Sequence, residues 1–176
     1  LGRAEELGIQ YLVFGSGKAK GVPEGFPLEE GYRQVVDLLQ QVAPLAQRHG
    51  VTIVIEPLRR AECNLINSFE EGCRLAADAD MMNVKVLVDF YHLTEEKEPV
   101  EHLIEMGKEN LRHVHFANPT GRVYPEKDDE ADYKPFFDAL KAIGYDQRIS
   151  CEAYAENFEE DAKKALEFFR RNWQAG

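Results

Sequence analysis

The chain has 176 residues, 44% of them hydrophobic and 30% charged, with a formal net charge of −11. That is enough apolar material for one globular domain, and the acidic surface would repel phosphate backbones and anionic lipid, which argues against nucleic-acid and membrane binding. Three cysteines without disulfide or zinc-ribbon spacing, and no apolar stretch long enough to span a bilayer, favour a cytoplasmic protein.

The first elements are a short helical segment, a strand and a long helix. Residues 1–7 look like the last turns of a helix, and with no initiator Met before them they indicate a fragment of a longer protein. Residues 9–14 predict a strand that ends at a glycine-rich turn. Residues 28–49 have helical spacing, with Pro44 expected to kink the helix.

The same alternation continues to the end of the chain. The remaining predicted elements are strands at 51–56, 84–89, 111–116 and 148–152, and helices at 68–79, 99–106, 133–143 and 158–173. Alternating strands and helices predict parallel strands covered by helices, as in a doubly wound sheet or a (β/α)8 barrel. A full barrel typically needs ~250 residues. We therefore expect one domain over residues 1–176, with the five βα units of strands 4–8 and without the first three units.

Four polar residues stand at the C-terminal ends of successive strands: Glu56, Asp89, His115 and Glu152. Burying a charged or polar group at the end of an apolar strand is costly unless it has a partner. A single such carboxylate is usually a helix cap or part of an ion pair. Four in consecutive units favour a shared partner, and three carboxylates with one imidazole suit a divalent cation.

Other residues near these strand ends allow two interpretations each. His92, in the predicted loop after the third strand, is placed to meet a substrate hydroxyl or to bind backbone. His113 shares the strand parity of His115 but lies deeper, which favours a supporting or core histidine. Asn64 would contact sugar hydroxyls or shape its turn. The glycine loop at residues 15–18 would cradle a phosphate or merely end a strand.

Several stretches together carry a family resemblance. They are Ile55-Glu-Pro-Leu-Arg59, Val88-Asp-Phe-Tyr-His92, His113-Val-His-Phe-Ala-Asn118, Gly144-Tyr-Asp146 and Ile149-Ser-Cys-Glu152. Their order and spacing resemble the xylose isomerase-like TIM-barrel superfamily, and within it the sugar phosphate isomerase/epimerase group that includes the ketose 3-epimerases. The resemblance implies that the first strand here is the fourth of a barrel, and that strands five to eight carry the four metal ligands.

The resemblance also implies a reaction. Members remove a proton next to a carbonyl through an enediolate, with two glutamates, here Glu56 and Glu152, as acid and base. The expected activity is a metal-dependent isomerase or epimerase of a small sugar or sugar phosphate. Mn²⁺, Mg²⁺ and Co²⁺ suit the ligand set, and Zn²⁺ is possible. Arg122 matches a substrate-contacting arginine of the family, the alternative being a surface arginine among acidic residues.

Two alternative functions are compatible with the same sequence, and a third is disfavoured by it. A dehydratase or a hydroxypyruvate-type isomerase would begin with the same proton abstraction. An inactive barrel fragment would self-associate into a homo-oligomer through its exposed strand edges. An endonuclease IV-type nuclease would need further histidines, and no histidine follows His115. The acidic charge also argues against DNA as a substrate.

Overall fold

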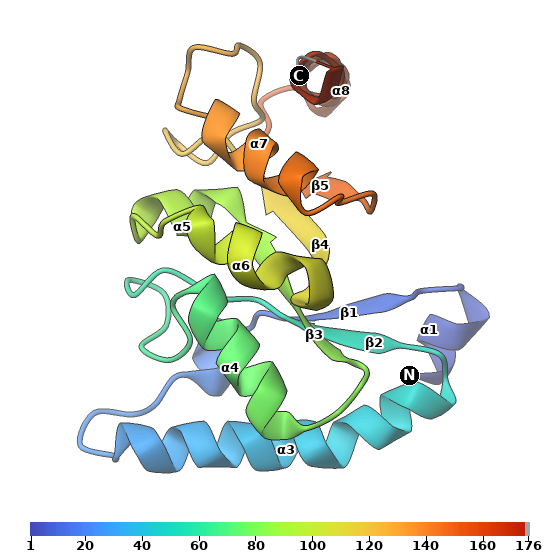
Figure 1. Cartoon of the computed structure of the whole chain (residues 1–176), viewed down its shortest axis with the longest axis vertical. Helices are drawn as coiled ribbons and strands as arrows, with labels where there is room; N and C mark the ends of the chain where they lie inside the picture. Colours follow the sequence, from blue (N-terminus) through green and yellow to red (C-terminus); the bar gives the residue numbers. More distant parts are fainter. Residues whose placement is uncertain (175–176) are drawn as a thin grey trace.

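The computed structural model describes residues 1–174 and contains one parallel five-stranded sheet with the order β1-β2-β3-β4-β5 (Figure 1). The strands are β1 Tyr11–Phe14, β2 Thr52–Ile55, β3 Val84–Asp89, β4 Leu111–Phe116 and β5 Ile149–Cys151. Each strand pairs with the next along the chain. The sheet curves so strongly that the Tyr11 hydroxyl, on β1, donates to Gln147 Oε1, just before β5, at 3.3 Å. The architecture is a partial (β/α) barrel.

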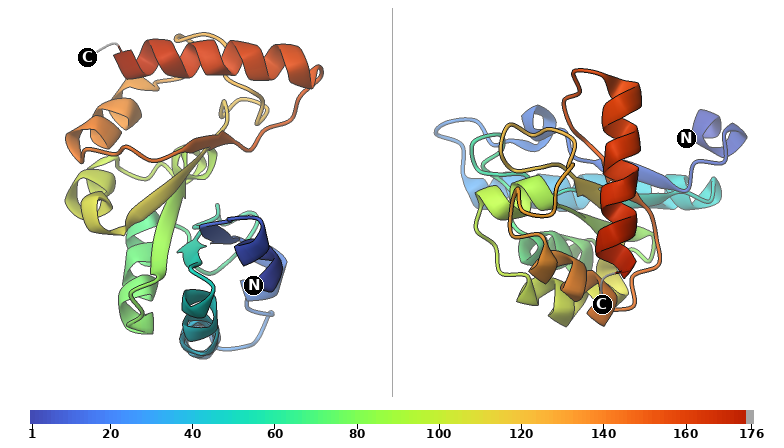
Figure 2. Two further views of the ribbon diagram at one scale, coloured as in Figure 1. Left: turned by 90° about the vertical axis from the view of Figure 1, so that its right-hand side faces the viewer. Right: turned by 90° about the horizontal axis from the view of Figure 1, so that it is seen from above.

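The longer helices follow one another along the outside of this sheet in chain order (Figure 1). The described residues form eight helices in all. They are α1 Gly2–Glu6, α2 Gly17–Lys20, α3 Leu28–Arg48, α4 Phe69–Ala79, α5 Phe90–Glu95, α6 Glu101–Asn110, α7 Lys134–Ala142 and α8 Phe158–Gln174. Figure 2 shows α3, α4, α6, α7 and α8 as an arc around the strands. Among the described residues, no helix combines the length and the apolar character needed to cross a membrane.

The predicted strands and long helices agree with the structure to within a few residues. Ser68 caps α4, where its Oγ accepts a hydrogen bond from the Glu71 backbone N–H at 3.1 Å. Pro44 lies inside α3, which bends toward its C-terminal end in Figure 1. The short helices α2 and α5 were not predicted. Each has at most six residues, too few for helical periodicity to be visible in the sequence.

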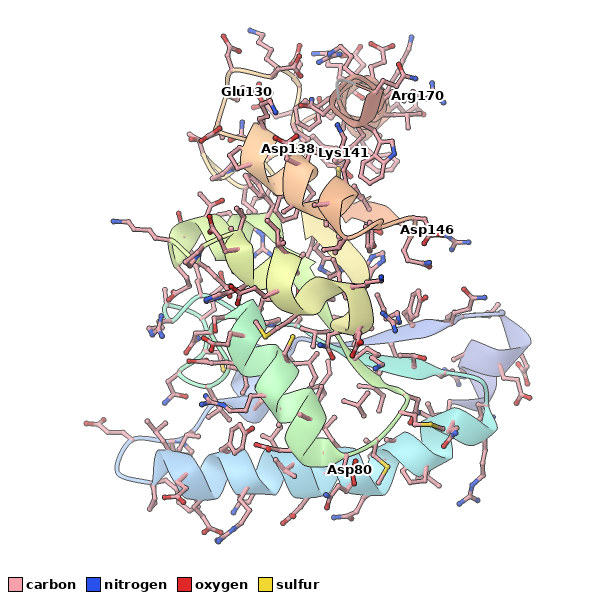
Figure 3. The ribbon with its side chains drawn as sticks, in the orientation of Figure 1. Asp80, Glu130, Asp138, Lys141, Asp146 and Arg170 are labelled. Carbon is pink, nitrogen blue, oxygen red and sulfur yellow. The ribbon has the colours of Figure 1, made fainter. Side chains whose placement is uncertain are left out.

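The two faces of the sheet have different roles. Outward-facing side chains such as Ile55 and Phe116 pack against the helices in the hydrophobic core. Because side chains alternate along a strand, Glu56 and Asp89 point to the opposite, inner face. Charged side chains, including those of Asp138 on α7 and Arg170 on α8, cover the outside of the helices (Figure 3). The inner face therefore gathers charged groups where the strands end, with His113 lying two residues deeper on β4.

Candidate metal centre

The four strand-end residues lie together at the C-terminal edge of the sheet. Each of Glu56, Asp89, His115 and Glu152 offers one ligand atom, and these atoms all lie within 4.8 Å of one another. The strand register explains this, because Asp89 and His115 are direct partners across β3 and β4. His115 Nδ1 lies 2.8 Å from Glu56 Oε1 and 3.2 Å from Glu152 Oε2.

Burial and mutual contacts set the charges of this cluster. Asp89 is only 2% exposed, and burial raises the pKa of its carboxyl group to about 7. For His115, burial lowers the pKa, but hydrogen bonds with Glu152 and Glu56 outweigh burial and raise the pKa to about 10. The hydrogen bond from His115 lowers the pKa of Glu152 to about 2. Without a metal, the His115 imidazolium therefore neutralises part of the carboxylate charge.

The donor set fits a divalent cation. Asp89 Oδ1 accepts a hydrogen bond from the Tyr91 backbone N–H at 2.8 Å, whereas Asp89 Oδ2 is buried without a hydrogen-bond partner. Burying a carboxylate oxygen without a hydrogen-bond partner costs free energy unless a bound ligand contacts that oxygen. Gly15 packs its backbone against the cluster, and a Cβ atom there would lie 1.7 Å from Glu56 Oε2. Three carboxylates and one imidazole match the oxygen preference of Mg²⁺, Mn²⁺ or Co²⁺ and also accommodate Zn²⁺.

A cavity of about 420 Å³ opens beside the cluster. It is lined by Gly15, Gly17, Lys18, Glu56, Leu58, Ala61, Glu62, His92, Arg122 and Glu152. Two of the cluster's carboxylates, Glu56 and Glu152, thus face the same space, which has the size of a small-molecule site.

The structure corrects the prediction that His92 lies in a loop. His92 belongs to α5, which begins directly after β3 because the Asp89 side chain caps its N-terminus. His92 is 3% exposed, and its Nδ1 accepts a hydrogen bond from the Arg59 backbone N–H at 3.3 Å. The neutral ring therefore carries its proton on Nε2, which is buried without a hydrogen-bond partner and lies 3.7 Å from Asp89 Oδ2.

The side chain of Arg122 points toward the cluster. Its NH2 group lies 3.0 Å from Glu152 Oε2 and 3.7 Å from Asp89 Oδ2, and its NH1 group lies 3.7 Å from Glu62 Oε1. Glu62 lines the cavity but was not singled out in the sequence. It is one acidic residue among many in the sequence, and its contacts with Arg59 and Arg122 distinguish it only in the structure.

The remaining candidates have structural contacts. Asn64 Oδ1 accepts a hydrogen bond from the Val22 N–H and its Nδ2 donates to the Val22 carbonyl, both at 2.9 Å. Asn64 does not line the cavity, so its contact with a sugar stays a prediction. His113 packs edge-on against His115, with ring centroids 5.2 Å apart. Lys18 is exposed at the cavity rim, and phosphate binding by its loop also stays a prediction.

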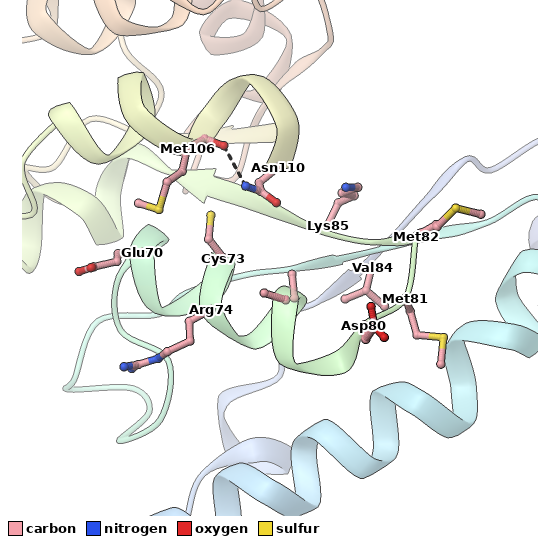
Figure 4. A pocket seen from close by; sticks show the side chains of 12 residues that line it. Glu70, Cys73, Arg74, Asp80, Met81, Met82, Val84, Lys85, Met106 and Asn110 are labelled. Carbon is pink, nitrogen blue, oxygen red and sulfur yellow. Dashed lines mark hydrogen bonds between the residues drawn. The ribbon is translucent and has the colours of Figure 1, made fainter.

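A second cavity, of about 560 Å³, lies between α4 and α6 on the outside of the barrel (Figure 4). Met81, Met82 and Met106 line it together with Cys73. None of the four cluster residues lines this cavity. Of these two cavities, only the smaller one at the strand ends is lined by cluster residues.

Comparison with known proteins decides the family. The model of the xylose isomerase-like TIM barrel matches residues 1–172. The chain belongs to this family. This xylose isomerase-like chain is 27% identical over 154 residues to L-ribulose 3-epimerase of Mesorhizobium japonicum, an alignment that covers 84% of this chain and 49% of that protein. It spans about half the length of the curated relatives it matches.

Solved structures share the family fold. A D-psicose 3-epimerase from Clostridium cellulolyticum H10 with D-tagatose superposes with a TM-score of 0.85 at 22% identity, over 97% of this chain and 67% of that one. A structure described as the IOLI protein with a zinc atom superposes with a TM-score of 0.81 at 21% identity, over 98% of this chain and 66% of that one. The family and the barrel fold predicted from the sequence are confirmed.

Proposed function

We propose that this chain carries the metal-binding and proton-transfer part of a divalent-metal-dependent sugar isomerase or epimerase. One observation carries the proposal: Glu56 and Glu152 belong to one ligand cluster and line one cavity. The family membership and the sugar epimerases among the relatives support the same reaction class. The substrate would be a small sugar or sugar phosphate that enters the cavity at the strand ends.

The reaction requires a base next to a carbon that bears a carbonyl group. In epimerisation, one carboxylate removes the proton from one face of that carbon, and the C–H electrons move toward the carbonyl as the enediolate forms. The other carboxyl group returns a proton to the opposite face. Glu56 and Glu152 come from the ends of different strands, β2 and β5, and this arrangement suits two-sided proton transfer. Aldose–ketose isomerisation would use the same groups to move a proton between adjacent carbons.

The other residues would hold the cation and orient the sugar. Glu56, Asp89, His115 and Glu152 would bind Mn²⁺, Mg²⁺, Co²⁺ or Zn²⁺. When bound, the cation supplies Lewis-acid stabilisation of the negative charge that develops on the sugar oxygens. His92 on α5 and Arg122 in the loop after β4 both line the cavity and would donate hydrogen bonds to sugar hydroxyls.

Deuterium uptake from heavy water into a panel of ketoses tests the proposal. The Mn²⁺-loaded protein should exchange a carbon-bound proton of at least one ketose. Glu56→Gln and Glu152→Gln should each slow the exchange by ~100-fold or more, because each removes one acid–base group. Chelation of the metal should abolish the exchange, and calorimetry should show weaker divalent binding in both variants.

Glu160→Gln, an exposed substitution on α8, serves as the matched control and should leave exchange and metal binding unchanged. The absence of exchange with every ketose, despite tight metal binding, would contradict catalysis and favour an inactive fragment. Exchange accompanied by loss of water would indicate a dehydratase. Divalent affinity that does not change in Glu152→Gln would refute the ligand assignment.

A further inference from the structure

We infer that Tyr91 is a positioning residue that acts through Arg122, an inference that rests on the proposed function. Tyr91 is the second residue of α5 and is 7% exposed. It neither belongs to the ligand cluster nor lines the cavity. Its aromatic ring nevertheless contacts the guanidinium of Arg122, which lines the cavity and lies beside Glu152 of the cluster.

The ring contacts two guanidinium groups. The Cζ atom of Arg122 lies 4.9 Å from the centroid of the Tyr91 ring, and the Cζ atom of Arg59 lies 5.0 Å from it. Both distances are within the range of cation–π attraction, which strengthens where water is excluded. Tyr91 thereby joins the loop after β2, which carries Arg59, to the loop after β4, which carries Arg122.

A carboxylate offsets the repulsion between the two cations. Glu62 Oε1 lies 2.7 Å from Arg59 Nε and 3.7 Å from Arg122 NH1. Glu95 Oε2 binds Arg59 NH1 at 2.9 Å and so keeps Arg59 at the ring. With Arg59 tied to both carboxylates, the Arg122 guanidinium lies against the face of Tyr91, between Glu62 and its 3.0 Å partner Glu152.

The backbone of Arg122 is fixed independently of its side chain. Its φ angle is +53°, a left-handed conformation that a non-glycine residue adopts at a cost. The Tyr154 N–H donates to the Arg122 carbonyl at 2.8 Å, and the Asn118 N–H donates to the Val123 carbonyl at 2.9 Å. These bonds hold the main chain, so the remaining freedom of Arg122 is in its long side chain, which the Tyr91 ring restricts.

Tyr91 also supports the cluster through its main chain. Its backbone N–H binds Asp89 Oδ1 at 2.8 Å, and this bond survives any substitution of the side chain. A change at the ring should therefore alter the position of Arg122 and leave the metal ligands in place. A substitution that weakens sugar binding but leaves metal binding unchanged would therefore indicate a positioning role. General damage to the site would weaken both.

Tyr91→Leu and Tyr91→Phe form the matched pair that tests the inference. Leucine removes the aromatic face and fills similar space, whereas phenylalanine keeps the face and loses only the hydroxyl. For the metal-loaded protein, Tyr91→Leu should raise the KM of the exchanging ketose about tenfold, with kcat and the divalent Kd little changed. Tyr91→Phe should restore the KM to within about twofold of the parent value.

A second readout does not depend on activity. The Nε–H resonance of Arg122, assigned by its loss in Arg122→Lys, should carry a ring-current shift in the parent protein and in Tyr91→Phe. The shift should disappear in Tyr91→Leu. In the Arg122→Gln background, Tyr91→Leu should add no further loss of ketose binding, because the ring acts only through the guanidinium.

The two readouts separate the possible failures. If the parent protein exchanges no ketose but the resonance responds as expected, the proposed function fails and the contact between Tyr91 and Arg122 stands. An Arg122 resonance that is unchanged in Tyr91→Leu would overturn the inference. Equal loss of ketose binding in Tyr91→Phe and Tyr91→Leu would also overturn it, because the aromatic face would then have no role.

Discussion

At the scale of single residues, the arrangement of Glu56, Asp89, His115 and Glu152 depends on the absence of a side chain at residue 15. Gly15 directly follows β1 and lies against Glu56, where a Cβ atom would lie 1.7 Å from Oε2 and 2.9 Å from Cδ. The obstructed group is the end of a flexible side chain, so it would move away instead of disrupting the fold. That movement would take one carboxylate out of the ligand set.

Gly15→Ala should therefore weaken divalent binding by ~10–100-fold, the range seen when the support of a metal ligand is lost. The thermal unfolding midpoint of the metal-free protein should fall only slightly, because His115 would lose its contact with Glu56 but keep the one with Glu152. Gly2→Ala is the control, since a Cβ atom there meets nothing within 4 Å. Calorimetric titration of both variants checks this, and parent-like affinity in Gly15→Ala would show that Glu56 is not a required ligand.

At the scale of elements, one carboxylate joins the starts of two helices on the outside of the barrel. Glu98 accepts hydrogen bonds at 2.8 Å from the Phe69 N–H in the first turn of α4, and it lies 2.9 Å from His102 Nδ1 in α6. The hydrogen bond with Glu98 raises the pKa of His102. Helices α4 and α6 are thus connected by a contact that is strongest when His102 is protonated.

The stability of the fold should depend on pH through this pair. Because the folded-state pKa of His102 is raised, its contribution is fully present below the unfolded pKa of about 6.5 and is lost as pH rises through the folded pKa. His102→Gln should cost about 1 kcal/mol of unfolding free energy near pH 5.5 and less near pH 8.5. Urea denaturation at both pH values measures this, and an equal cost at both would contradict the contribution of the charged form.

At the scale of the whole molecule, the curved sheet has two edges. Among the described residues, β1 pairs only with β2, and β5 pairs only with β4. Leu12 and Val13 on β1 are 39% and 40% exposed, and Leu166 and Trp173 on α8 are 50% and 39% exposed near the other edge. Unpaired backbone groups beside exposed apolar side chains favour association with another chain.

This chain should therefore self-associate in a concentration-dependent way. Val13→Lys places a charge on the edge strand and should shift the population toward the monomer. Sedimentation velocity across a range of concentrations checks this, with Lys163→Ala on the outer surface of α8 as a control that should leave the distribution unchanged. A monomer at every concentration of the parent protein would contradict the prediction.

The sequence by itself determined the order of the strands and long helices, the family, and which residues lie at the strand ends. The sequence was sufficient to predict that Glu56, Asp89, His115 and Glu152 lie near one another. Parallel strands bring their C-terminal ends to one edge of the sheet whatever the details of packing. The capping motif at Ser68 was also readable, since capping depends on residues only three positions apart.

Tertiary structure alone decided the surroundings of these residues. It placed His92 in a helix, turned Arg122 toward Glu152, set Glu62 between two arginines and laid Gly15 on Glu56. The helix around His92 starts at a local cap, but the other outcomes depend on contacts between different βα units, often thirty or more positions apart. Local sequence patterns carry no information about such contacts, because they arise only when the curvature of the sheet brings the loops of successive units together.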